Sequence, residues 1–232
     1  MFRTVRHWWS EGSGQHTARL FLFELFVVIA GVLIAQGLAS WMADRAALAD
    51  MEQGRAALRE QVAENASTAE AWQVAAQCLD DRVALIMRRL AAGPLDPGMS
   101  DRPVLDSFQS LALSERSFGL LRDRHGSQEA SDFENTRRQV EFSNARIQRI
   151  VSEWGRLTLA DPLNGRPTQF DRDQARLAAA DIRGELRALK VGSADLASTA
   201  HAMGIGVPSQ AGLRPVRDCA QMWAAKAISV RR

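Results

Sequence analysis

One apolar run near the start of the chain, residues 20–42, limits what the rest of it can do. The run reads LFLFELFVVIAGVLIAQGLASWM, and residues 25–35 within it carry no polar side chain. A bilayer core is crossed by about 20 helical residues, so the run is long enough for one transmembrane helix. Arg19 precedes it, and Trp41, Asp44 and Arg45 lie at its other end, as expected of interfacial residues. The pattern predicts a membrane anchor.

Two other interpretations of the run stay open. A buried helix of a soluble domain is one, although core runs are usually shorter. A cleaved signal peptide is the other, since Gly37, Leu38 and Ala39 before Ser40 resemble a small-residue cleavage site. The long leader and Glu24 inside the apolar stretch disfavour cleavage.

The orientation of the anchor follows from the short leader. Arg3, Arg6 and Arg19 precede the run, with Glu11 opposing them, and a similar number of arginines follow it. A short N-terminal tail and a large translocated C-terminal domain favour an N-terminus in the cytoplasm. We therefore expect residues 1–19 to be a basic cytoplasmic leader, residues 20–42 to cross the bacterial inner membrane, and residues 43–232 to form a periplasmic domain.

Glu24 is the residue of the run that most needs an explanation. A carboxylate within the hydrocarbon is costly unless it is paired, protonated or near the interface. On a helical wheel Gly31, Ala35 and Met42 lie close to Glu24, so that one face combines an acid with small residues. Two hypotheses stay open. Either this face is a helix–helix seam, or Glu24 extends from the first turn to the headgroups beside Arg19.

Composition limits the class of partner. The 232 residues include 29 basic and 27 acidic ones, for a net charge of +2, and this balance excludes a strong nucleic-acid footprint. Two lysines, abundant arginine and alanine, and no tyrosine suggest a GC-rich bacterial genome. The cysteines are Cys78 and Cys219, and an even count outside the cytoplasm favours a disulfide. Two buried free thiols are the alternative.

The residues after the run predict an all-α domain. An apolar stripe with alternating steps of three and four follows at once, which is typical of coiled-coil or bundle packing. Its members are Leu48, Met51, Arg55, Leu58, Val62, Asn65, Ala69, Trp72, Ala76, Leu79, Val83, Ile86 and Leu90. Glycine and proline clusters then separate further helical patterns. We expect a transmembrane helix that continues into an elongated antiparallel bundle, with helices at about 43–91, 103–123, 127–160, 169–203 and 217–230.

Catalytic signatures are missing from the sequence. The four histidines are not paired at helical spacing, and no zinc-protease, phosphate-loop or nucleophile-elbow motif is present. Asp80, Asp81 and Arg82 are interpreted as solvated or ion-paired charges. Residues 122–125 are interpreted as a charged loop, with the mouth of a ligand pocket as the alternative. We expect no cofactor, no metal and no catalysis, and a membrane-anchored hydrolase is the least favoured class.

The N-terminal segment also resembles a known group. Residues 24–35, ELFVVIAGVLIA, followed by Trp41 and a charged helix, resemble uncharacterised bacterial single-span membrane proteins. The resemblance covers roughly residues 15–65, implies membrane anchoring, and carries no catalytic residue. We expect a scaffold or partner-binding protein whose partners are the lipid bilayer and either a second copy or another membrane protein. A small-ligand-sensing periplasmic bundle is the alternative.

Overall fold

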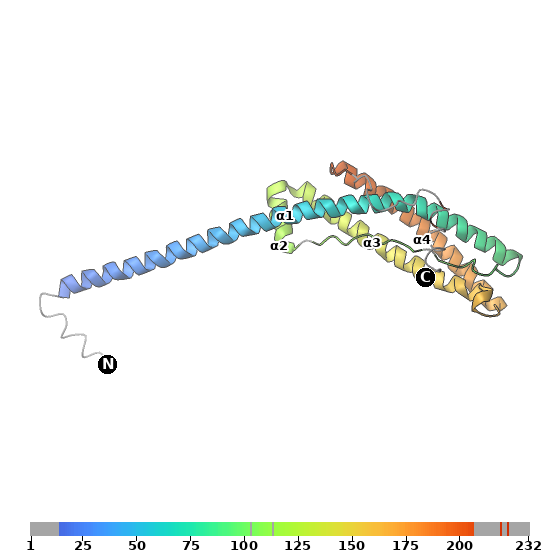
Figure 1. Cartoon of the computed structure of the whole chain (residues 1–232). Helices are drawn as coiled ribbons and strands as arrows, with labels where there is room; N and C mark the ends of the chain where they lie inside the picture. Colours follow the sequence, from blue (N-terminus) through green and yellow to red (C-terminus); the bar gives the residue numbers. More distant parts are fainter. Residues whose placement is uncertain (1–13, 103, 113, 207–218, 220–221, 223–232) are drawn as a thin grey trace, which may run out of the picture. The chain divides into compact units, whose positions relative to one another are not determined.

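The computed structural model describes residues 14–102, 104–112, 114–206, 219 and 222, and within them it is all-α, without strands. Four α-helices follow one another: α1 (Gly14–Ala92), α2 (Glu115–His125), α3 (Ser127–Leu157) and α4 (Gln169–Ala202) (Figure 1). Two short 3-10 helices, η1 (Thr158–Ala160) and η2 (Pro162–Asn164), connect α3 to α4. The all-α class expected from the sequence is confirmed. The chain forms two compact units, Met1–Glu52 and Gln53–Arg232.

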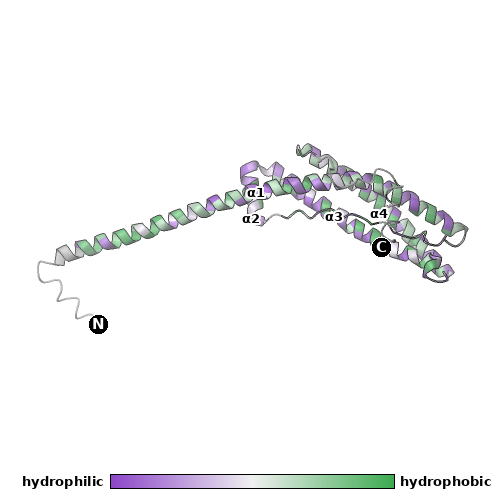
Figure 2. Ribbon diagram, in the orientation of Figure 1, coloured by the Kyte–Doolittle hydropathy of each residue, from purple (hydrophilic) through white to green (hydrophobic). Residues whose placement is uncertain are grey.

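The first unit contains the beginning of α1. Among the described residues there is one helix that is long and apolar enough to cross a membrane, and it lies near the N-terminus. None of its apolar window is buried in the structure, and Figure 2 shows this stretch of α1 as predominantly hydrophobic. The helix passes from this stretch into the amphipathic one without a break, as the sequence predicts.

The second unit is a bundle of three long helices: the later part of α1, α3 and α4. Two contacts place α4 antiparallel to α1, since Arg183 pairs with Asp80 at 2.7 Å and Lys190 donates to Gln77 at 3.1 Å. The start of α3 lies beside the start of this part of α1, where Arg55 pairs with Glu129 at 3.0 Å. Helices α1 and α3 therefore run in the same direction and α4 runs against both.

The helices of the bundle begin and end where the sequence supplies caps. Thr168 and Asp171 form a capping box at the start of α4. Ser114 caps α2 by accepting from the backbone N–H of Ser117. Gly126 separates α2 from α3. Its φ of 96° favours glycine, because residues with a side chain rarely adopt that backbone conformation.

The core of the bundle follows the predicted apolar stripes. From Leu58 to Leu90 every member of the α1 stripe is buried, Asn65 included. The apolar face of α4 is also buried; its members are Ala178, Ile182, Leu186, Leu189, Leu196 and Ala200. Helix–helix packing of these stripes stabilises the bundle, since each fully buried Leu or Ile contributes about 1.5–3 kcal/mol relative to an exposed one.

One predicted helix is wrong over half of its length. We expected a helix at 103–123, but α2 begins only at Glu115, and the described residues from 101 to 112 form neither helix nor strand. Residues 101–102 and 104–112, here called the strap, run back along the bundle toward the start of α2. The predicted helix at 217–230 falls outside the described residues, apart from Cys219 and Met222, which are helical.

Candidate functional site

Side-chain amides of the neighbouring helices hold the strap. They make the hydrogen bonds to its backbone that a neighbouring strand would make in a sheet. Asn65 of α1 donates to the backbone O of Gln109 at 2.8 Å and accepts from its N–H at 2.7 Å. Asn144 of α3 forms the same pair of bonds with Phe108, both at 2.9 Å. Two consecutive residues of the strap are therefore bonded to two different helices, α1 and α3.

The register of the strap shows that it is extended. Gln109 lies at Asn65 and Asp106 lies at Trp72, whose indole N–H donates to the backbone O of Asp106 at 3.0 Å. Seven helical residues rise about 10.5 Å, and three extended residues rise about 10 Å. The two lengths match, so an extended strap lies along α1 with about three of its residues to every seven of the helix.

The turn just before the strap is anchored by one buried acid. Asp161, 2 % exposed, accepts from Gly98 N–H, Leu163 N–H, Ser100 N–H and the Ser100 hydroxyl, the last at 2.7 Å. Burial raises the pKa of Asp161, but the bonds from Ser100 and the backbone N–H groups outweigh burial and hold the pKa below its ordinary value. The carboxylate is therefore ionised, and Trp154 adds a bond to the backbone O of Ser100.

At its other end the strap forms one wall of a groove of about 630 Å³. Its apolar surface consists of Leu58, Leu111 and Phe133, all buried, together with the half-buried Phe118. The whole lining comes from α1, the strap, α2 and α3. Polar side chains at the start of α2 and in α3 line the rest of the groove. The polar members are Ser114, Glu115, Glu134 and Arg137.

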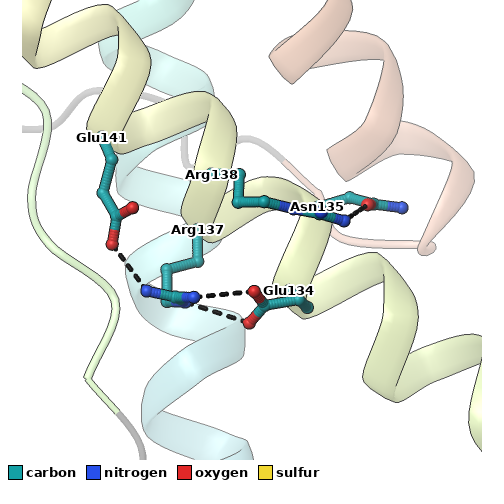
Figure 3. A network of polar contacts seen from close by, with 5 residues as sticks. All are labelled: Glu134, Asn135, Arg137, Arg138 and Glu141. Atoms are coloured by element: carbon teal, nitrogen blue, oxygen red, sulfur yellow. Dashed lines mark hydrogen bonds and ion pairs between the residues drawn. The ribbon is translucent and has the colours of Figure 1, made fainter.

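Arg137 is fully engaged at the edge of this groove (Figure 3). Its Nε and Nη2 donate to the two oxygens of Glu134 at 3.0 and 2.7 Å, and its Nη1 donates to Glu141 at 2.7 Å. The hydrogen bond from Arg137 holds the pKa of Glu134 below its usual range, and the two carboxylates raise the pKa of Arg137. Glu115, Glu134 and Arg137 all line the groove, so its charged side chains are two acids and one base.

A second, more polar pocket of about 700 Å³ lies between α3 and α4. The side-chain Oε1 of Gln139 is buried there without a hydrogen-bond partner. Its lining comprises Gln128, Asp132, Asn135, Arg138, Gln139, Ser198, Thr199 and Ala202. Such a lining suits a polar ligand, whereas the groove beside the strap suits an amphipathic one.

The cysteines lie together in the structure. The sulphur atoms of Cys78 and Cys219 are 2.01 Å apart and form a disulfide, the pairing that the sequence analysis favoured over two free thiols. Cys78 is buried in α1 and Cys219 is exposed. The bond ties the C-terminal segment to the middle of the first bundle helix across 141 residues.

The residues of the proposed seam, Glu24, Gly31, Ala35 and Met42, are all exposed in the first unit. Asp80 pairs with Arg183 in the bundle, and the hydrogen bond from Arg183 lowers the pKa of Asp80. Arg122 and Asp123, expected in a charged loop, lie in the last turns of α2 and pair at 4.0 Å. Sequence reasoning missed the groove, although Asn65 within an apolar stripe was a signal of the strap that forms it.

In the part of the chain that the structure describes, no group of three or more histidine, cysteine, aspartate or glutamate side chains could hold a metal ion. The chain matches no protein-family model, no curated protein and no solved structure. The class of protein that the fold defines is thus an all-α protein with one candidate membrane-spanning helix and an adjoining three-helix bundle.

Proposed function

We propose that this protein is a single-pass inner-membrane protein whose periplasmic bundle binds a partner, either a second copy or another membrane protein. The groove beside the strap is the observation that carries the proposal. Above the buried Leu58, Leu111 and Phe133 it leaves the half-buried Phe118 and the exposed Ala112 accessible, beside a strap that is bonded on both sides. A rigid apolar surface with a polar edge is what protein partners bind.

The proposed location rests on two features. The apolar start of α1 has no protein covering it, which suits a lipid environment. A disulfide persists in the periplasm and is rare in the cytoplasm, so the bond between Cys78 and Cys219 favours a bundle outside the cell membrane. Fusions of an alkaline phosphatase reporter test this topology. We expect activity when the reporter follows residue 232 and none when it precedes residue 1, and the reverse result would overturn the orientation.

Site-specific photo-cross-linking in native membranes tests partner binding. A photoreactive residue in place of Glu115, exposed at the groove, should give a discrete protein adduct. The same residue in place of Gln148, exposed on α3 away from the groove, is the control and should give none. Phe118→Asp should abolish the adduct at position 115. Recovery of monomer alone at both positions would contradict the proposal.

The proposed seam is a second place for self-association. Glu24, Gly31, Ala35 and Met42 are exposed, and small residues allow close approach of two membrane helices. An ideal Cβ at Gly31 meets no atom within 4 Å, so a larger side chain there would fit the single chain. Glu24→Leu with Gly31→Ile should therefore reduce oligomer size in detergent while the bundle keeps its fold. An unchanged size would exclude the seam.

A ligand-sensing bundle is the alternative function, and the volume of the groove favours it. A cavity of about 630 Å³ is within the range of small-molecule sites. Its acidic edge should accept apolar amines better than fatty acids of equal length, because Arg137 is already held by two carboxylates. A thermal-shift screen with the two series separates the functions. A shift with the amines supports sensing, and no shift with either series supports a protein partner.

A further inference from the structure

The pocket between α3 and α4, here called the α3–α4 pocket, contains a buried acceptor without a donor. The Oε1 of Gln139 is buried, and no hydrogen bond reaches it in the part of the chain that the structure describes. The pocket around it is accessible, because Ser198 and Ala202 on its α4 side are exposed. A buried carbonyl oxygen without a donor is costly. Its position in an accessible pocket therefore indicates a donor that comes from outside the bundle.

The same molecule shows what a side-chain amide on these helices binds. Asn65 and Asn144 each hold one residue of the strap, by donating to its backbone O and accepting from its backbone N–H. Gln139 lies five residues before Asn144, on the side of α3 that lines the α3–α4 pocket. Its amide has the same donor and acceptor groups. The donor that its Oε1 lacks is thus of the kind that a backbone N–H supplies.

The α3–α4 pocket has the length of a short extended segment. On α3 its lining reaches from Gln128 to Gln139, which is eleven residues or about 16.5 Å of helix. An extended chain covers that distance with about five residues at about 3.3 Å each. The volume of about 700 Å³ is also within the range of ligand sites.

The two helices that form the pocket are held at a fixed spacing. One turn beyond Gln139 they approach each other, since an ideal Cβ at Gly192 of α4 would lie 3.8 Å from the Oγ of Ser143. Further along, Glu185 of α4 pairs with Arg146 and Arg149 of α3 at 2.7 and 2.9 Å. The pocket is therefore preformed, which lowers the cost of binding.

The lining carries no net charge. Its acid and its base are Asp132 and Arg138, and water screens both because Arg138 is exposed and Asp132 is half-buried. Each is also bonded to a side-chain amide: Asp132 accepts from Gln128 at 2.9 Å, and Arg138 donates to Asn135 at 2.6 Å (Figure 3). The buried acceptor is the neutral amide of Gln139. A neutral backbone N–H suits it better than the ammonium of a free peptide, whose burial would add the desolvation cost of a charge.

We propose that the α3–α4 pocket binds an extended internal segment of another protein, about five residues long, with Gln139 bonded to one of its backbone amides. The described chain that follows α4 leads to α1 instead. It turns at Gly204, at a φ of 64°, and Arg59 of α1 donates to the backbone O of Met203 and of Gly204 at 3.5 and 3.4 Å. The pocket shares no lining residue with the groove beside the strap, so this inference does not rest on the proposed function.

Calorimetric titration of synthetic peptides into the full-length chain in mild detergent tests the site. The probes are acetylated and amidated peptides of alternating alanine and serine, with three, five and seven residues. Affinity should rise from three to five residues, and seven residues should bind within about threefold of five. A five-residue analogue with methylated backbone nitrogens should bind about tenfold more weakly, because it has no N–H to donate. A five-residue peptide with free ends should bind no tighter than the blocked one.

Variants assign the binding to this pocket. Gln139→Leu should weaken the five-residue peptide about tenfold and leave the melting temperature unchanged or raised, because it removes an unpartnered buried oxygen. Ser198→Trp should block the pocket from the α4 side. Gln148→Leu, at an exposed position of α3 outside the pocket, is the matched control and should leave the affinity unchanged. Phe118→Asp alters the groove and should also leave it unchanged.

The possible results distinguish this site from the groove. Loss of peptide binding in Phe118→Asp but not in Gln139→Leu would overturn the α3–α4 site and assign the peptides to the groove. Binding of none of the probes, or equal binding of the methylated analogue, would overturn the inference as well, while a cross-linked adduct at Glu115 would still support the proposed function. Tighter binding of the free-ended peptide would contradict an internal segment. A lower melting temperature of Gln139→Leu would give its amide a structural role and contradict the inference.

Discussion

Asn65 is the residue whose replacement should have the largest consequence for the groove. It is fully buried in an otherwise apolar stripe, and its amide makes both hydrogen bonds of Gln109, two residues before Leu111. In Asn65→Leu the helix keeps its packing volume, but the N–H and C=O of Gln109 lose their partners. Each lost bond of this kind costs about 0.5–1.5 kcal/mol, so the two together should cost about 2 kcal/mol.

Asn65→Asp is the more severe change despite its similar shape. One oxygen still accepts from the N–H of Gln109, while the other replaces a donor and lies 2.8 Å from the backbone carbonyl O. A buried carboxylate without a cation adds a desolvation cost, so we expect a loss of about 3–5 kcal/mol. The order of stability, original above Leu above Asp, distinguishes hydrogen bonding of the strap from simple packing, since packing alone would favour leucine.

Urea unfolding of the full-length chain in mild detergent measures these losses. The buried Trp72 and Trp154 both bond to backbone O atoms near the strap and supply the fluorescence signal. Asn135→Leu, at an exposed site on α3, is the matched control and should change the unfolding free energy by less than about 0.5 kcal/mol. If Asn65→Leu were as stable as the original chain, the strap would not depend on this amide and the reasoning would fail.

Three further changes test other anchors of the bundle. Asp161→Asn should cost about 2–4 kcal/mol at neutral pH, since an amide cannot accept the four bonds of the carboxylate. The folded pKa of Asp161 lies below its unfolded value, so its contribution to the free energy of unfolding is present above about pH 4 and declines as the pH falls through the folded pKa. Urea titrations at pH 7 and pH 3 should therefore show a smaller difference between variant and original at pH 3. Reduction of the disulfide should lower the unfolding free energy by up to about 5 kcal/mol and change the non-reducing gel mobility, and Cys78→Ser should remove both effects of the reductant. Asp80→Asn, which breaks a half-exposed pair with Arg183, should cost less than about 1 kcal/mol by the same urea assay.

The helices with strong periodicity could be predicted from the sequence closely. The apolar stripe of α1 is dictated by burial against two neighbours, and its expected end at residue 91 differs by one residue from the observed Ala92. The helices expected at 127–160 and 169–203 correspond to Ser127–Leu157 with η1 and to Gln169–Ala202. In each case glycine, proline or a cap residue sets the boundary, and these signals are local in the sequence.

The strap could not be predicted because its spacing is ambiguous. Leu105, Phe108 and Leu111 recur every three residues, which suits one face of a helix and also an extended chain with a three-residue turn. The side chains that decide between them, Asn65 and Asn144, lie 44 and 36 residues away from their partners. The groove depends on the same hydrogen bonds between residues far apart in the sequence, so local sequence patterns could not predict it either.

The polar side chains that bond the strap and the turn before it have one common physical cause. An extended segment packed on helices has backbone N–H and C=O groups with no ladder to satisfy them, and buried backbone groups must be paired. Asn65 and Asn144 supply both a donor and an acceptor, the two indoles supply donors, and Asp161 accepts at the turn where the strap begins. Each is a poor choice for helix–helix packing by itself. A buried amide in an otherwise apolar helical stripe therefore indicates a neighbouring segment without secondary structure, and here it locates the one that forms the wall of the groove.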